Sequence, residues 1–363
     1  RGAQAALTST GYDSVALAFD PARQVMVAWD GNQTSTFEWS GATWNAVAGT
    51  PLAVASSSYS YIAFAYDVAR TQMVLFGGYG FNGGDDYDVT WARTATTWAQ
   101  PPAFAEPPDR FRSAAAYDPV RRRVVLFGGF DSGHTAMSDT WEWNGSTWTQ
   151  AAPTASPPAR AGMMMDYDPK TRTVMLFAGD TSGSTFADLW SYNGTTWTQP
   201  GLSTGRTGIR NGGMAYDSLA DRVVTFAGRD DGGGTYSNLD TTWYWDSSGW
   251  HQASSVTKPP ARRNFGIAFD PVRNRTVVFG GYDSSTNPVS DVWEWNETSW
   301  TQVSPLAGPD PRIGLEMLYD PDVSRVLVFG NSGSLSGEDL WEWNGTAWNQ
   351  RQVVGTIDTR YRE

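Results

Sequence analysis

Residues 113–150 read SAAAYDPVRRRVVLFGGFDSGHTAMSDTWEWNGSTWTQ, and this stretch decides the fold of the chain. Two short apolar runs, residues 113–117 and 124–127, are separated by a segment that begins with Asp118-Pro119. Asp and Pro favour turns because Asp hydrogen-bonds to nearby backbone and Pro fixes its own backbone angle. The pattern predicts a first β-hairpin, whose strands we call A and B.

A second hairpin follows the glycine pair at residues 128–129 and a polar loop. Residues 140–143 and 147–150 alternate aromatic and polar side chains on either side of Asn144-Gly145, a strong signal for a two-residue hairpin turn. These two strands are called C and D. A single four-stranded sheet of this kind has apolar side chains on both faces, so it requires further copies packed against it.

The expected copies are found along the whole sequence. An aromatic residue followed by Asp ends strand A seven times, and the Asp positions are separated by 47, 51, 50, 49, 53 and 50 residues. A period of roughly 50 residues with four strands per unit is typical of a propeller blade. The aspartates are Asp20, Asp67, Asp118, Asp168, Asp217, Asp270 and Asp320.

The paired glycines after strand B and the spaced aromatic residues of strands C and D resemble the kelch repeat. The resemblance covers nearly the whole chain. The chain is likewise similar to the central domain of galactose-oxidase-like proteins. It implies an all-β fold, a seven-bladed β-propeller of four-stranded antiparallel blades. It does not define an activity, because one fold carries many functions.

The repeat sets the expected domain organisation. We expect an N-terminal tail over residues 1–11, one propeller over residues 12–350 and a C-terminal tail over residues 351–363. Whether the tails help to close the ring is left open. The expected blades span residues 12–48, 59–100, 110–150, 160–200, 209–253, 262–303 and 312–350.

Composition limits the classes of partner. The 363 residues have a net charge of −12 and a pI of about 4.6, so nucleic acids and anionic membranes are disfavoured as partners. No apolar run is long enough for a membrane-spanning helix. With 19 Trp and only Lys170 and Lys258 as lysines, the chain is similar in composition to secreted bacterial proteins, so we expect a secreted or periplasmic location. We also expect a monomeric domain, and whether it is part of a larger chain is left open.

Arginines recur at the start of strand A, in the loop that joins strand D to the next strand A. The resemblance implies that this D–A loop and the B–C loop surround the mouth of the propeller, where arginines often bind acidic ligands. We therefore predict a ligand-binding rim. The alternative is structural, with each Arg paired to an Asp or a backbone carbonyl. The predicted rim comprises Tyr12, Tyr59, Arg110, Arg112, Arg160, Arg210, Arg262, Arg263 and Arg312.

Two carboxylates depart from the repeat on the innermost strand. Glu316 and Asp166 occupy positions that are small or apolar in the other copies. A carboxylate there must be paired, hydrated or raised in pKa. Two interpretations of Glu316 and Asp166 remain open, an acid–base role and a structural ion pair. His134 in the third B–C loop, Tyr59 and Tyr12 complete the candidate catalytic residues.

Metal sites have little support in the sequence. Calcium is the one metal that we consider, because clustered loop carboxylates suit a hard cation. The candidates are Asp85, Asp86, Asp88, Asp230 and Asp231. The copper centre of galactose-oxidase-like enzymes is excluded, since the resemblance requires a Tyr–Cys cross-link and the chain has no Cys.

We therefore interpret the chain as a binding module with an Arg- and Tyr-lined mouth for an acidic ligand, either a glycan or an acidic peptide. Tyr236 and Tyr282, which lie outside the repeat register, are among the aromatic residues that we expect near the mouth. One alternative is a mutarotase- or lyase-like enzyme on anionic sugars, although no catalytic motif is present. Another alternative is a propeller that serves assembly through its sides.

Overall fold

A computed structural model describes the chain in segments. These are residues 15–20, 22–30, 35–39, 44–47, 59–60, 62–80, 89–94, 97–102, 106–181, 183–200, 208–230, 236–246, 248–321, 323–330, 339–351 and 353–354. Regular secondary structure in these segments is entirely β, and they contain no helix that could span a membrane. The chain divides into two compact units, residues 1–40 with 45–202 and residues 41–44 with 203–363.

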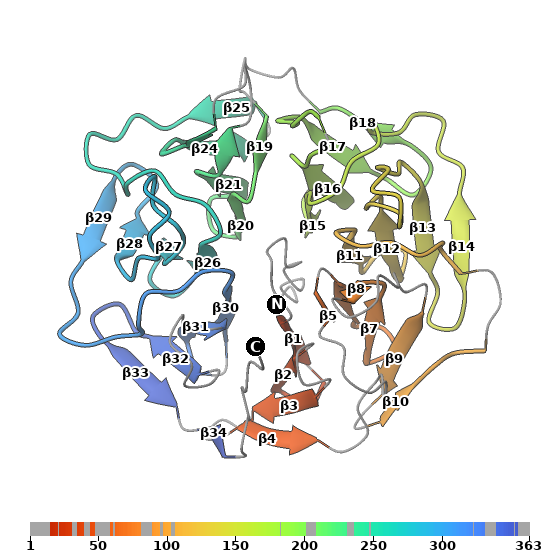
Figure 1. Cartoon of the computed structure of the whole chain (residues 1–363), viewed down its shortest axis with the longest axis horizontal. Coiled ribbons are helices and arrows are strands. Elements are labelled where there is room, and N and C mark those ends of the chain that lie inside the picture. Colours follow the sequence, from red (N-terminus) through yellow and green to blue (C-terminus); the bar gives the residue numbers. More distant parts are fainter. Residues whose placement is uncertain are drawn as a thin grey trace. The chain divides into compact units, whose positions relative to one another are not determined.

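The first unit contains four antiparallel sheets, which we number first to fourth (Figure 1). Their strand orders are β1-β2-β3-β4, β6-β7-β9-β10, β11-β12-β13-β14 and β15-β16-β17-β18, and β5 pairs with β8. The strands are β1 (Val15–Asp20), β2 (Val25–Asp30), β3 (Ser35–Trp39), β4 (Trp44–Val47), β5 (Tyr59–Ser60), β6 (Ala63–Asp67), β7 (Gln72–Phe76), β8 (Tyr79–Gly80), β9 (Thr90–Thr94), β10 (Thr97–Ala99), β11 (Ala114–Asp118), β12 (Arg123–Phe127), β13 (Thr140–Trp143), β14 (Trp148–Ala151), β15 (Met164–Asp168), β16 (Thr173–Phe177), β17 (Leu189–Tyr192) and β18 (Trp197–Thr198).

The second unit contains three further four-stranded sheets, numbered fifth to seventh, with orders β20-β21-β24-β25, β26-β27-β28-β29 and β30-β31-β32-β33. It also contains a small three-stranded sheet, β19-β22-β23. The strands are β19 (Ile209–Arg210), β20 (Gly213–Asp217), β21 (Arg222–Phe226), β22 (Arg229–Asp230), β23 (Ser237–Asn238), β24 (Thr242–Asp246), β25 (Gly249–Gln252), β26 (Gly266–Asp270), β27 (Arg275–Phe279), β28 (Val292–Trp295), β29 (Trp300–Val303), β30 (Glu316–Asp320), β31 (Arg325–Gly330), β32 (Asp339–Trp343), β33 (Trp348–Arg351) and β34 (Val353–Val354).

The all-β class and the four-stranded antiparallel sheets of the prediction are confirmed. The strands of the third sheet lie within about one residue of their expected bounds, because Asp118 pairs with Arg123 across the A–B hairpin and so belongs to β11. Closure of the sheets into a seven-bladed ring stays a prediction.

The aspartate that ends strand A fixes the A–B turn. In the third sheet, Asp118 Oδ1 accepts hydrogen bonds from the backbone N–H groups of Val120 and Arg121, each at 2.9 Å. This Asx-type arrangement satisfies two backbone donors that have no strand partner. The same contacts recur at Asp20, Asp67, Asp168, Asp217 and Asp270, so the repeated Asp is a turn residue.

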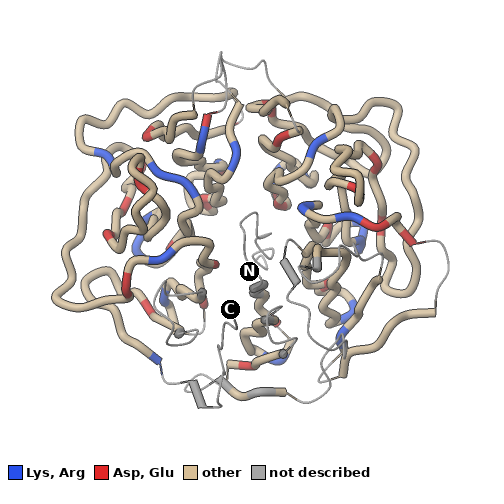
Figure 2. The backbone as a smooth tube through the Cα atoms, viewed as in Figure 1, with Lys and Arg blue, Asp and Glu red and all other residues tan. Residues whose placement is uncertain are grey.

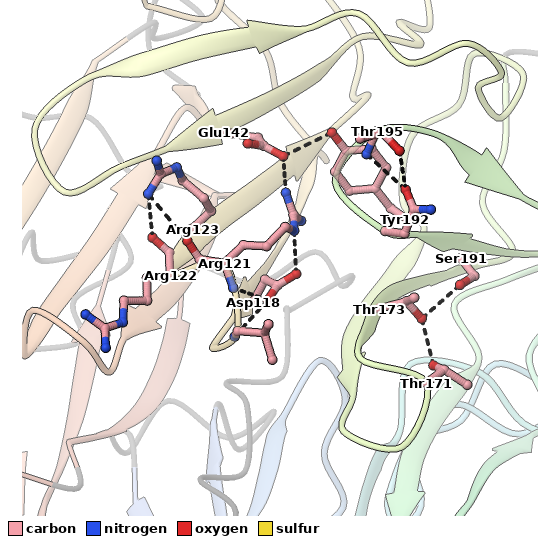
Figure 3. A network of polar contacts seen from close by, with 12 residues as sticks. Asp118, Arg121, Arg122, Arg123, Glu142, Thr171, Thr173, Ser191, Tyr192 and Thr195 are labelled. Carbon is pink, nitrogen blue, oxygen red and sulfur yellow. Dashed lines mark hydrogen bonds and ion pairs between the residues drawn. The ribbon is translucent and has the colours of Figure 1, made fainter.

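The A–B turn is also tied to the following sheet (Figure 3). Arg121 Nε donates to Asp118 Oδ2 at 2.7 Å, and its Nη1 donates to Glu142 of strand C. Tyr192 of the fourth sheet donates its hydroxyl to Glu142 Oε1 at 3.0 Å and carries the Arg121 guanidinium over its ring. A Cβ at Gly194 would lie 2.6 Å from the Cδ of Arg121, so the C–D turn needs Gly for this approach as well as for its positive φ.

Tryptophans fill the space between consecutive sheets. Trp197 of the fourth sheet donates its Nε1–H to Thr140 Oγ1 of the third at 2.9 Å, and Trp300 of the sixth donates to Thr242 of the fifth at 2.7 Å. Trp197 also packs in one buried cluster with Phe127 of the third sheet. The in-register Trp residues therefore belong to the core between sheets, where burial of their large apolar area stabilises the stack.

Candidate functional site

The D–A and B–C loops lie together in both units. In the third sheet, Phe111 of the D–A loop forms a β-bridge with Phe130 of the B–C loop, and Phe130 forms another with Ala136. In the sixth sheet, Arg263 and Tyr282 form the corresponding bridge. The segments that we expected to carry function are thus adjacent at one end of each of these sheets.

Four of the predicted rim arginines are buried rather than displayed. Arg110, Arg160, Arg262 and Arg312 are at most 1% exposed. The Nη atoms of Arg110 donate to both carboxylate oxygens of Asp139 at 2.7 Å, and Nη1 also donates to the Gly128 carbonyl. The same pairing joins Arg160 to Asp188 and Arg262 to Asp291.

These pairs are electrostatically satisfied within their own sheets. Burial alone would raise the pKa of Asp139, but hydrogen bonds from Arg110 and Trp141 and the Arg110 charge outweigh burial, so this pKa lies below its ordinary value. The pKa values of Asp188 and Asp291 are lowered for the same reason. The geometry favours the structural alternative for these arginines, since their donors are already used to fix the loops.

Arg112 lies closer to the surface but is also paired. Its Nη2 donates to Asp180 Oδ1 at 2.9 Å, which joins the third sheet to the fourth, and its guanidinium lies 5.7 Å from the ring centre of Phe130. The Arg112 side chain is 17% exposed. Its φ of 55° lies in the left-handed region. The equivalent residues in other sheets also have a positive φ, but they are glycine or asparagine, namely Gly162, Asn211, Asn264 and Gly314. A large residue in this conformation requires such contacts to hold it.

The remaining rim arginines, Arg210 and Arg263, lie half-exposed in the second unit, where the structure adds Arg229. Arg210 of β19 and Arg229 of β22 are directly opposite each other in the strand register. Directly opposite residues share one face of a sheet, and like charges in this position are destabilising. Arg229 is in turn opposite Asn238 of β23.

Arg263 and two tyrosines complete this group. Arg263 Nη1 donates to Asn238 Oδ1 at 3.1 Å, and its guanidinium lies 5.0 Å from the ring centre of Tyr282. The Arg229 guanidinium lies 4.1 Å from the ring centre of Tyr236, which is 71% exposed. The three arginines thus lie on or beside one small sheet, with two of their guanidiniums against aromatic rings. We call this set the arginine–tyrosine surface: Arg210, Arg229, Arg263, Tyr236, Tyr282 and Asn238.

The sequence prediction missed Arg229. Its signal is its place directly after the glycine of strand B, where the second, third and sixth copies have the aromatic residues Tyr79, Phe130 and Tyr282.

Basic and acidic residues are otherwise interspersed along the described backbone of both units (Figure 2).

Several predicted residues lie wholly or partly outside the described part of the chain. Tyr12, Asp85, Asp86, Asp88 and Asp231 are outside it. The backbone of Tyr59 pairs with Gly80, and its side chain is not described. Asp230 lies on β22 opposite Ile209. Among the residues that the structure describes, no group of three His, Asp or Glu is placed to hold a metal ion.

The described catalytic candidates lie in different sheets. His134 is exposed in the third B–C loop, with its ring edge against Phe111 at 5.3 Å. Asp166 is buried in β15 and accepts a hydrogen bond from the Tyr167 backbone N–H at 2.7 Å. Glu316 is buried in β30 of the second unit. His134 and Asp166 share no hydrogen bond, so the first unit brings no acid–base pair together from them.

Asp166 gives a testable pH dependence. Burial and, to a smaller extent, the nearby Asp168 charge raise its pKa to about 7, against the partial opposition of the Tyr167 N–H. The folded state therefore retains a proton that the unfolded chain releases above pH about 4. The stabilising effect of this proton is complete below that pH and is lost as the pH rises to about 7, by about 1.4 kcal/mol per pH unit.

We expect Asp166→Ala, which installs the residue found at Ala116 and Ala215, to remove this dependence. Urea unfolding measures the free energy of unfolding of both proteins at several pH values. The free energy of the variant relative to that of the wild type should rise between pH 4 and 7 and stay constant above pH 7. A difference in unfolding free energy that does not change with pH would contradict the raised pKa.

The repeated sheets, with loops anchored by buried Arg–Asp pairs and Trp residues between neighbours, define a repeat protein of the propeller-blade type. Residues 63–218 match the family model of the KLHDC2/KLHL20/DRC7 Kelch-repeats domain, so this part of the chain is a Kelch-repeat domain. A search of curated proteins found no match.

Proposed function

We propose that the chain is a protein-interaction module whose arginine–tyrosine surface takes an acidic segment of a partner. Kelch-repeat domains are generally protein-interaction modules, which supports the broad class. The observation that carries the proposal is the placement of Arg210 directly opposite Arg229, with Arg263 held nearby by Asn238. Guanidinium groups that share one face of a sheet bind a carboxylate through charge-assisted hydrogen bonds.

The tyrosines suit a peptide ligand. Tyr236 is largely exposed beside Arg229, and Tyr282 backs Arg263. An aromatic ring with a polar hydroxyl contacts both the apolar and the polar parts of a peptide, and stacking restricts the guanidinium before the ligand arrives. The surface thus offers cations for acidic side chains and ring faces for the segment between them.

The test is binding of a labelled Glu-rich peptide, compared with its Gln-substituted counterpart, by fluorescence anisotropy. We expect only the Glu-rich peptide to bind, with an affinity that falls as salt is raised. Arg263→Met should weaken binding by about 2 kcal/mol, or roughly thirtyfold, because hydrogen bonds to a charged group are lost. Arg210→Met should act in the same direction.

Arg275→Met is the matched control, because Arg275 begins β27 at the other end of the sixth sheet and donates to backbone carbonyls of its own turn. It should leave binding unchanged. Equal loss in this control, or equal binding of the Gln peptide, would contradict the proposal. An anionic oligosaccharide that displaces the peptide and depends on Arg210 and Arg263 would favour the glycan alternative.

A further inference from the structure

A second cationic surface lies at the opposite end of the strands, on the A–B turns of the third and fourth sheets. Arg122, Lys170 and Arg172 are exposed there, and Arg123 is half-buried. We call these four residues the turn surface. It belongs to the first unit and shares no residue with the arginine–tyrosine surface.

Two of its arginines depart from the repeat. Arg122 and Arg172 occupy the left-handed position of the A–B turn, with φ values of 55° and 57°. The turn geometry itself favours Asn, Asp or Gly there, and a long cation has no local advantage. The equivalent residues of the other turns are all neutral or acidic, namely Gln24, Thr71, Asp221, Asn274 and Ser324.

The guanidiniums of Arg122 and Arg172 form no hydrogen bond or ion pair with any residue that the structure describes. The Arg122 backbone carbonyl accepts hydrogen bonds from Arg70 and Arg123, while its side chain points away from the network (Figure 3). These two charges are therefore not part of the inter-sheet pairing that occupies Arg121.

Nearby carboxylates do not neutralise the surface. Asp118 is buried and paired with Arg121, and Asp168 is buried and accepts hydrogen bonds from its own turn. Glu142 is held by Arg121 and the Tyr192 hydroxyl. The exposed charge of these two turns is positive, although the whole chain has a net charge of −12.

The two turns are neighbours. Ala116 of β11 and Met165 of β15 pack in one buried cluster, so the strands that lead into the turns are adjacent. The Tyr167 hydroxyl, at the end of β15, is in electrostatic range of both Asp118 and Arg172, one from each turn. Two adjacent turns of the first unit thus both carry cations that face solvent.

We propose that the turn surface binds an anionic polysaccharide that carries carboxylate or sulfate groups at intervals along a hydroxyl-bearing chain. Exposed guanidinium groups bind such oxyanions through paired hydrogen bonds. On the C–D turns of the same sheets, the exposed Ser146 and Thr195 hydroxyls donate to Asn144 and Asn193, and their oxygens can accept hydrogen bonds from the sugar hydroxyls between the charges.

Two observations favour a polysaccharide over a nucleic acid. The A–B and C–D turns of these sheets expose no aromatic side chain on which a base could stack, over residues 119–123, 144–147, 169–172 and 193–196. The net charge of −12 also repels a densely charged polymer more strongly than one with spaced charges.

The experiment measures binding of a chondroitin sulfate oligosaccharide to the full chain by calorimetry or anisotropy over a range of salt. The double variant Arg122→Ser/Arg172→Ser installs the residue that the seventh turn has at Ser324, so the fold should be retained. We expect binding about tenfold weaker than in the wild type, because two cations are lost. The slope of log affinity against log salt should fall by roughly one to two.

Arg275→Ser is the control and should bind the oligosaccharide as the wild type does. The double variant should still bind the Glu-rich peptide, and Arg263→Met should still bind the oligosaccharide, so the two proposals fail independently. No binding by the wild type at low salt overturns the inference. Equal weakening in Arg275→Ser, equal binding of neutral dextran, or equal binding of a DNA duplex also overturns it.

Discussion

Arg160→Met should lower the free energy of unfolding by about 3–5 kcal/mol, the largest loss that we expect from one rim position. Arg160 is fully buried, and its Nη atoms lie 2.5 and 2.9 Å from the two oxygens of Asp188. It also donates to the carbonyls of Pro158 and Ala178. Methionine fills much of the volume but leaves a carboxylate that is only 17% exposed without its cation.

Urea unfolding of three variants separates the charge effect from packing. Arg160→Met/Asp188→Leu should recover part of the loss, because an apolar pair removes the uncompensated charge. Arg172→Met, on the exposed A–B turn, should change stability by less than about 0.5 kcal/mol. If Arg160→Met were as stable as the wild type and lost ligand binding, Arg160 would belong to a binding rim and the structural interpretation would be wrong.

The sequence predicts these sheets because each local signal demands one backbone geometry. The Asp that ends strand A satisfies turn N–H groups in the first to sixth sheets, and the glycine after strand B has a positive φ in the second to sixth sheets. Alternating aromatic residues place Trp197 and Trp300 between neighbouring sheets. These constraints are local, so they can be recognised without knowledge of distant contacts.

The rim was harder to predict because the partner of each arginine lies far along the chain. Arg110 and Asp139 are 29 residues apart, and position alone does not show whether the guanidinium faces solvent or a carboxylate. A signal was nevertheless present. Arg occurs at the start of strand A only in copies that have Asp two residues before the first strand C Trp, while the fifth copy has Ile209 with Thr241.

The arginine–tyrosine surface depends on the one sheet that the repeat did not predict, β19-β22-β23. Its register places Arg210 opposite Arg229, and two-residue strands have too little pattern to be recognised in a sequence. The fifth copy lacks the Arg–Asp pair, with Ile209 in place of Arg, and its B–C loop has Arg229 at a position that is aromatic in the second, third and sixth copies. Departures from the repeat therefore indicated the site better than conformity to it did.

Gly179→Ala is the second change with a large expected effect, because Gly179 begins the B–C loop of the fourth sheet, and the equivalent Gly228 and Gly281 begin the loops that carry the arginine–tyrosine surface. Gly179 has a φ of 102°, which residues with a side chain rarely adopt. An added Cβ would lie 2.9 Å from the Ala161 carbonyl oxygen and 3.2 Å from the Cβ of Met163. We expect a loss of about 2–3 kcal/mol in the free energy of unfolding.

Gly183→Ala is the matched control, since Gly183 lies in the same B–C loop and a Cβ there would meet nothing within 4 Å. It should leave the unfolding midpoint within experimental error of the wild type. The first residue of the glycine pair, which is Gly77, Gly128 and Gly280 in the second, third and sixth sheets, is Ala178 here and Ala227 in the fifth sheet, at φ values of 64° and 50°. The backbone φ at the substituted position, rather than the loss of glycine as such, thus determines how much free energy of unfolding is lost. If Gly179→Ala and Gly183→Ala unfold at the same urea concentration, the second glycine of the pair serves no conformational purpose and its recurrence in the repeat needs another cause.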